Sequence, residues 1–178
     1  MFATDRVGHM RYILPLLALL NVTPAHAGPV DDLVTEGQAA LVRMDVPAAM
    51  SFFDEALKLD PTQPMAAYGR GRILMKMGET KKAMADFTTA IIADPKFGLA
   101  YVRRGEAFMI LKNPDGAFKD FDAAIAASPL DAEVHVVRAT YRFQIGNLAG
   151  AKADVEAALL VANEQQKPVL EKMLARMK

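Results

Sequence analysis

One phrase recurs along this chain at a spacing of 34 residues. The chain contains FDEALKLDP, FTTAIIADP and FDAAIAASP, which begin at Phe53, Phe87 and Phe121. A period of this length predicts small structural units that stack, because one unit cannot bury its own apolar face. The positions that keep the period are Gly37, Gly71 and Gly105; Ala49, Ala83 and Ala117; Phe53, Phe87 and Phe121; Ala56, Ala90 and Ala124; and Pro61, Pro95 and Pro129.

Each period predicts two amphipathic helices joined by a short turn, at about 64–77 and 80–93 in the second unit. Gly71 and Ala83 are expected to let the two helices cross closely. The prolines are expected to end each second helix, since the residue before a proline disfavours helical geometry. Gly78, Gly146 and Asn113 mark the turns within the pairs, and Asn113 can cap a helix that begins at Pro114.

The fourth period is weaker and is followed by one more helical segment. Ala139, Val155 and Asn163 replace the glycine, phenylalanine and proline. Residues 166–178 then predict a helix that caps the last unit, and a free helix that recruits a partner is the alternative. Its apolar stripe consists of Val169, Leu170, Met173, Leu174 and Met177.

These markers resemble the tetratricopeptide repeat family over residues 30–163. The resemblance implies an all-α solenoid of about four helix-turn-helix units in a domain at 28–165, followed by the capping helix. The units would span 30–63, 64–97, 98–131 and 132–165. The chain departs from the family at Leu33, Ala67, Tyr101 and His135, where the family often has Trp, and most clearly at Arg142, where it often has Tyr.

The first 27 residues predict a secretory signal peptide. Arg11 is followed by the apolar run Tyr12–Val22 and by a small-residue site that ends at Ala27, and Met10 is an alternative start. The run is too short for a membrane-spanning helix. Cleavage after Ala27 is expected, with an uncleaved anchor or a core helix as the alternatives. Because the chain has no cysteine, export to a bacterial periplasm is favoured over an animal secretory route.

Charge argues against nucleic acid as a general partner. The full chain has 21 basic and 21 acidic residues, and removing residues 1–27 takes away Arg6, Arg11 and Asp5, which leaves a net charge of −1. A near-neutral chain lacks the basic excess of a general binder of nucleic acid or anionic membranes.

The sequence contains no recognisable catalytic or metal site. His135 is the one histidine after residue 27, and with no cysteine the usual three or four metal ligands are missing. The periodic Asp86, Asp120 and Asp154 are expected on solvated helix faces. Met75 and its neighbours could suit Cu(I), but methionine more often fills cores and adaptable binding surfaces. No enzyme activity, cofactor or metal is therefore expected.

The resemblance implies that the first helix of each pair lines a concave groove. An apolar surface with a few charges fits a docked peptide or helix, with packing inside a tight superhelix as the alternative. Arg103 or Arg72 would then pair with an acid on the ligand. The predicted groove residues are Met65, Tyr68, Arg72, Met75, Leu99, Val102, Arg103, Glu106, Met109, Val136 and Phe143, with Val34, Gln38, Leu41 and Thr140 at the same register.

The sequence thus predicts an exported, non-enzymatic scaffold or adaptor whose partner is a protein or peptide. Two alternatives remain open. The chain could self-associate through its repeat ends or groove, or it could be an accessory subunit of an envelope complex tethered by an uncleaved N-terminus.

Overall fold

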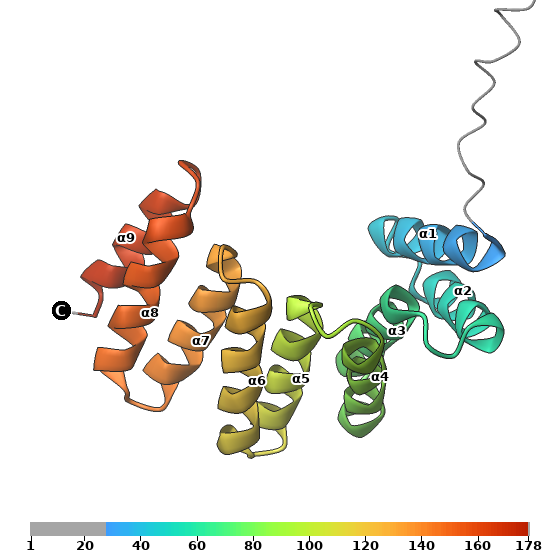
Figure 1. Ribbon diagram of the computed structural model, residues 1–178, viewed down its shortest axis with the longest axis horizontal. Helices are drawn as coiled ribbons and strands as arrows, with labels where there is room; N and C mark the ends of the chain where they lie inside the picture. Colours follow the sequence, from blue (N-terminus) through green and yellow to red (C-terminus); the bar gives the residue numbers. More distant parts are fainter. Residues whose placement is uncertain (1–27, 178) are drawn as a thin grey trace, which may run out of the picture.

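The computed structural model of the chain describes residues 28–177, and the predicted signal peptide at residues 1–27 lies outside them. The described residues form nine helices that follow one another in a curved row (Figure 1). The helices are α1 (Pro29–Val42), α2 (Val46–Leu59), α3 (Pro64–Lys76), α4 (Thr80–Ala93), α5 (Gly98–Ile110), α6 (Pro114–Ala127), α7 (Ala132–Gln144), α8 (Leu148–Val161) and α9 (Lys167–Ala175).

The helices pack in consecutive pairs, α1 with α2 through α7 with α8, and each pair packs on the next. The predicted all-α solenoid of helix pairs is therefore confirmed. The predicted segments 64–77 and 80–93 agree with α3 and α4 to within one residue. No helix within residues 28–177 is long and apolar enough to cross a membrane.

All four turns within the pairs have the same hydrogen bonding. In the second turn Gly78 N–H donates to the Met75 carbonyl and Glu79 N–H donates to the Leu74 carbonyl, which is the Schellman pattern at a helix end. The residue after the turn then caps the next helix in three of the pairs. Asn113 accepts from the Gly116 N–H at 3.0 Å, as its sequence context predicted, and Asp45 and Asn147 accept in the same way.

This turn places one residue of each pair in the left-handed region. Gly78 and Gly146 stand there in two turns with φ of 79° and 81°, but Met44 and Lys112 stand there in the others with φ of 61° and 58°. A side chain is disfavoured in this conformation, so the first and third turns are locally strained.

Within a pair, the glycine of the first helix lies against the phenylalanine of the second. A Cβ on Gly105 would lie 2.6 Å from Cε1 of Phe121, and a Cβ on Gly71 would lie 2.7 Å from Cε1 of Phe87. Both distances are too short for real atoms. The glycines are therefore required because the phenylalanine rings lie against them. The sequence predicts a close helix crossing at Gly71 and Ala83 and does not predict the contact with the ring. In the fourth pair both members change together, to Ala139 and Val155, and both remain fully buried.

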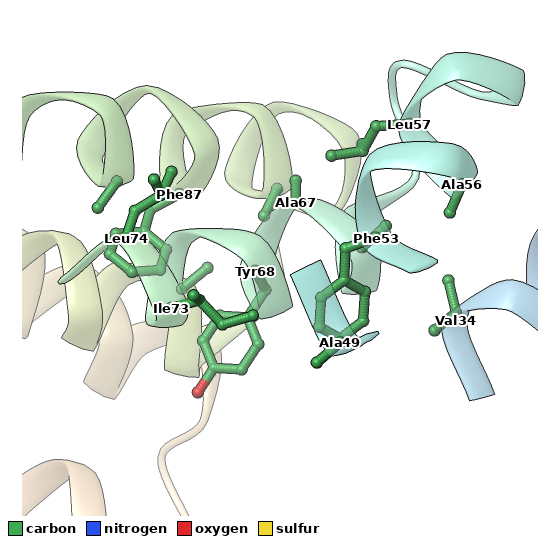
Figure 2. Packing of buried hydrophobic residues seen from close by; sticks show 14 of the residues in the cluster. Val34, Ala49, Phe53, Ala56, Leu57, Ala67, Tyr68, Ile73, Leu74 and Phe87 are labelled. Atoms are coloured by element: carbon green, nitrogen blue, oxygen red, sulfur yellow. The ribbon is translucent and has the colours of Figure 1, made fainter. Parts of the chain in front are cut away.

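The core consists mainly of the periodic positions. The rings of Phe53, Phe87 and Phe121 are fully buried, as are the periodic alanines. Figure 2 shows Phe53 and Phe87 among the buried residues of helices α1 to α4. One cluster extends from α1 to α5, and a second joins α7, α8 and α9. The periodic prolines are exposed and follow α2, α4 and α6 directly after their C-caps.

Helix α9 packs against α8 through one side of its apolar stripe. Leu170 is buried, and Met173, Leu174 and Met177 are half-buried against the second cluster. Val169 is 68% exposed, so its predicted place in the packed stripe is wrong.

We predict that Gly105→Ala lowers the free energy of unfolding by about 2 kcal/mol, because overpacking against Phe121 outweighs the better helix propensity of alanine. In the Gly105→Ala background, Phe121→Val should be less destabilising than in the wild type, since Ala139 and Val155 form that combination in the fourth pair. Denaturant unfolding of the single and double variants measures this coupling. Additive effects would contradict the contact.

We predict that Lys112→Gly raises the free energy of unfolding by about 1 kcal/mol, because glycine adopts positive φ without strain. Lys112→Ala keeps the strain while removing the same charge, so it serves as the control and should not stabilise. Thermal unfolding of both variants tests this, and equal melting temperatures would contradict the explanation.

Candidate functional site

The contacts between units define the concave side of the solenoid. The backbones of successive first helices approach one another, α1 and α3, α3 and α5, and α5 and α7, whereas within residues 28–177 no second helix brings its backbone close to that of the next second helix. The first helices therefore lie on the inner, shorter side of the curved row. The predicted groove residues come from this concave face.

Exposure divides the predicted groove residues into three groups. Met65, Arg72 and Phe143 are exposed, and Met75, Leu99, Arg103, Glu106, Met109 and Val136 are half-buried. Tyr68 and Val102 are only 6% and 3% exposed, so the prediction of a free surface is wrong at these two positions. Tyr68 is covered because its ring packs against Phe97, with centroids 4.8 Å apart, and against Phe87.

An apolar row remains accessible along the concave face. Met75, Met109 and Phe143 occupy the same register position in successive first helices, and Leu41 and Met177 continue it at the two ends. Phe143 is the most open of them, with 44% of its surface exposed. Methionine side chains suit a surface that adapts to its ligand.

The charged groups of this face are largely paired with each other. Arg103 Nη1 donates to Glu106 Oε2 at 2.9 Å, so Arg103 is already neutralised within the chain. Tyr141 of α7 lies near this pair. Its pKa is raised, first because the hydroxyl is partly buried and second because the Glu106 carboxylate is close. Arg72 lies over the Tyr68 ring, 5.6 Å from its centroid, and is exposed. Of the two predicted acid-binding arginines, Arg72 is the one that has no carboxylate partner among the described residues.

The concave face ends in an apolar crevice between α7 and α9. Helix α9 packs on α8, but its backbone does not approach that of α7 closely, although every earlier first helix touches the next one. The gap has a volume of about 600 Å³. Its lining contains two cations and no carboxylate, and consists of Thr140, Phe143, Gln144, Val169, Lys172, Met173, Arg176 and Met177.

Sequence reasoning missed this crevice because it assigned the apolar residues of 166–178 to packing alone. One signal was available. Met177 follows Phe143 by one period and Met173 stands at the register of the glycines, so α9 occupies the place of a fifth first helix. In the first three pairs this position is glycine because the second helix brings a phenylalanine ring against it. No second helix follows α9 in the described residues, so a methionine fits there.

The second helices are joined by a ladder of arginines that the sequence analysis overlooked. Arg104 binds Asp120 through two hydrogen bonds of 2.8 Å and reaches back to Thr88 Oγ1 in the preceding pair at 3.1 Å. Arg70 makes the same contacts with Asp86 and Asp54, and Arg138 makes them with Asp154 and Asp122. Each arginine therefore ties two consecutive pairs together.

This ladder corrects the prediction that Asp86, Asp120 and Asp154 form solvated faces. Their exposed fractions are 6%, 6% and 2%, because the arginines cover them and neutralise their charge. Arg142 also donates to Asp154, at 2.9 Å, which accounts for an arginine where the family often has tyrosine. These carboxylates are committed to packing and are not available as an acid–base pair.

His135 is buried. Its Nε2 lies 3.3 Å from the Pro129 carbonyl oxygen, and its Nδ1 has no partner among the described residues. Within residues 28–177, no group of three or more histidine, aspartate or glutamate side chains could hold a metal ion.

We predict that Arg104→Ala lowers the free energy of unfolding by about 3 kcal/mol, because it leaves the buried carboxylate of Asp120 without a partner. The adjacent Arg103→Ala removes an equal charge from a more exposed pair and should cost less than about 1 kcal/mol. Urea denaturation of the two variants measures the difference. Similar losses would mean that the ladder does not stabilise the fold.

Residues 68–132 match the family model described as tetratricopeptide repeat. Comparison with curated protein sequences gives no significant match. The fold is similar to that of several solved structures. TTC0263, described as a thermophilic TPR protein in Thermus thermophilus, is 23% identical over 83% of this chain and 80% of its own, with a TM-score of 0.68.

Two other solved structures are similar over most of this chain. MamA from Desulfovibrio magneticus RS-1 is 19% identical over 86% of this chain and 85% of its own, with a TM-score of 0.67. YrrB, described as a TPR protein with an unusual peptide-binding site, is 22% identical over 72% of this chain and 66% of its own, with a TM-score of 0.60. The described chain therefore has the tetratricopeptide repeat fold, and its central residues 68–132 match the family of that name.

Proposed function

We propose that this chain is a non-enzymatic scaffold that binds a segment of another protein on its concave face. The observation that carries the proposal is the apolar row of Met75, Met109 and Phe143, which stays accessible and leads into the crevice between α7 and α9. Exposed apolar surface with a few charges is typical of peptide and helix docking sites. YrrB, which shares the fold, is described as having a peptide-binding site.

The chemistry of the face indicates what kind of segment would bind. Apolar side chains would pack along the row and into the crevice, against Phe143 and Met173. Carboxylates on the segment would meet Arg72, Lys172 and Arg176, none of which has an ion-pair partner within residues 28–177. The preferred ligand is therefore an apolar segment that carries acidic residues. Arg103 does not contribute, because Glu106 neutralises it.

We also propose that the protein acts after export, in a bacterial periplasm. The support is the basic, apolar and small-residue pattern at residues 10–28 together with the absence of cysteine.

The proposal can be tested by selecting binders from a random peptide library displayed on phage. We expect enrichment of apolar peptides with acidic residues. Phe143→Ser should weaken their affinity about tenfold or more, since exposed aromatic anchors carry much of the energy of such interfaces. Lys172→Glu should weaken the acidic peptides specifically.

Ile92→Ser provides the matched control, because Ile92 is an exposed apolar residue on second helix α4, away from the concave face. Binding that survives Phe143→Ser but is lost in Ile92→Ser would contradict the proposal. So would a library that yields no peptide above the background of Phe143→Ser.

A further inference from the structure

A second apolar surface lies along the edge formed by the turns within the helix pairs. The turns from α3 to α4, α5 to α6 and α7 to α8 all lie along the lower edge of the molecule in Figure 1. Each turn exposes one or two large apolar side chains: Met77 in the first, Ile110 and Leu111 in the second, and Ile145 and Leu148 in the third. These five residues are called the turn edge below.

The turn edge projects outward instead of enclosing a groove. Met77, Ile110 and Ile145 are 63%, 58% and 54% exposed, although each stands at a helix end where a polar residue would serve as well. Neighbouring turns approach one another, since Leu111 lines a shallow cleft together with Gly78, Thr80 and Lys81 of the preceding pair. Leu111 therefore lies beside the preceding turn, and the apolar side chains of the three turns share one edge of the molecule.

Lysines flank this row. Lys76, Lys81, Lys82 and Lys112 are exposed beside the turn edge, against two exposed carboxylates, Glu79 and Asp115. Glu79 is paired with Lys82 at 3.3 Å, which leaves Lys76, Lys81 and Lys112 with no ion pair in the described part of the chain.

The opposite edge has an excess of carboxylates. Its loops and the helix turns beside them contain Asp60, Asp94, Asp131, Glu133 and Glu164 against Lys58, Lys96 and Lys167, and Lys167 pairs with Glu164 at 2.6 Å. Both edges expose large apolar side chains, since Leu59 and Leu130 are exposed on the opposite edge, and the two edges differ in the sign of their excess charge.

Lys112 adds one more observation at the turn edge, and Met44 has the same backbone conformation in the first turn, outside the turn edge. Lys112 occupies a left-handed position where glycine would be unstrained and where Gly78 and Gly146 stand in the flanking turns. Local strain of this kind is more common at functional positions. Here the strained residue places a cation directly beside Leu111.

We propose that the turn edge docks on the surface of an anionic lipid bilayer. Its apolar tips would enter the boundary between headgroups and acyl chains, while the lysines reach the anionic headgroups. Charge complementarity argues for this orientation, since the acidic edge then faces water. The concave face remains free, so this surface is separate from the proposed peptide site.

The test uses the absence of cysteine in the full-length chain, which allows one environment-sensitive dye to be attached at a chosen position. Met77→Cys, Leu111→Cys and Ile145→Cys probe the turn edge. Ile92→Cys and Leu160→Cys are matched controls, since these residues are 76% and 88% exposed on the second helices. Vesicles of phosphatidylcholine with and without phosphatidylglycerol are then added.

We expect the fluorescence to shift to shorter wavelength at the three turn-edge positions, only with phosphatidylglycerol, and not at Ile92 or Leu160. This readout reports the position of the dye, so it distinguishes docking by the turn edge from attachment through the apolar run at residues 12–22. No shift at the turn edge, or equal shifts at the control positions, would overturn the proposal.

Charge variants give a second measurement. Each lysine near an anionic surface contributes about fivefold to partitioning, so Lys76→Gln with Lys112→Gln should reduce vesicle binding of the turn edge about 25-fold. Lys58→Gln with Lys96→Gln removes two exposed lysines near the opposite edge and should leave it unchanged. Equal losses in both pairs would overturn the proposal. Leu111→Ser provides a third test. If sedimentation shows that this variant no longer self-associates while its vesicle binding is intact, the turn edge is a contact between copies of the chain and the proposal is overturned.

Discussion

The contact between a glycine on one helix and a phenylalanine ring on the next is the constraint on which the solenoid depends. Gly105 and Phe121 can approach each other only because no Cβ intervenes, and the same geometry recurs at every 34-residue step up to the third pair. Once each pair has this shape, each presents similar surfaces to its neighbours, and stacking follows. The fourth pair shows that the requirement concerns volume and not residue type, since Ala139 and Val155 replace both members together.

The arginine ladder joins these pairs and influences what the rest of the surface can do. Arg70, Arg104 and Arg138 each satisfy a carboxylate in their own pair and reach back to the preceding one. The ladder therefore uses the most conspicuous acidic residues of the repeat for packing between second helices. What remains for binding is the concave face of first helices, where the accessible groups are methionines, Phe143 and a few unpaired cations.

Much of the concave face could be predicted from register, but its accessibility could not. The period correctly placed Met75, Met109 and Phe143 on a common side. It also placed Tyr68 and Val102 there, and these are buried, because aromatic contacts with Phe97 and Phe87 cover Tyr68 and close packing covers Val102. The crevice between α7 and α9 depends on the angle at which the last helix leaves its neighbours, and no local pattern encodes that angle.

The sequence by itself determined the period, the two helices of the second unit to within one residue, and three of the four turns within the pairs, because helix propensity and caps are local properties of the chain. The tertiary structure alone decided which charges are neutralised. Asp120 is buried because Arg104, 16 residues away, covers it, whereas Lys112 has no such partner in the described residues and remains free beside Leu111. For the same reason a chain with almost no net charge can separate basic from acidic edges: composition counts charges, but only the stacking of pairs determines which of them meet.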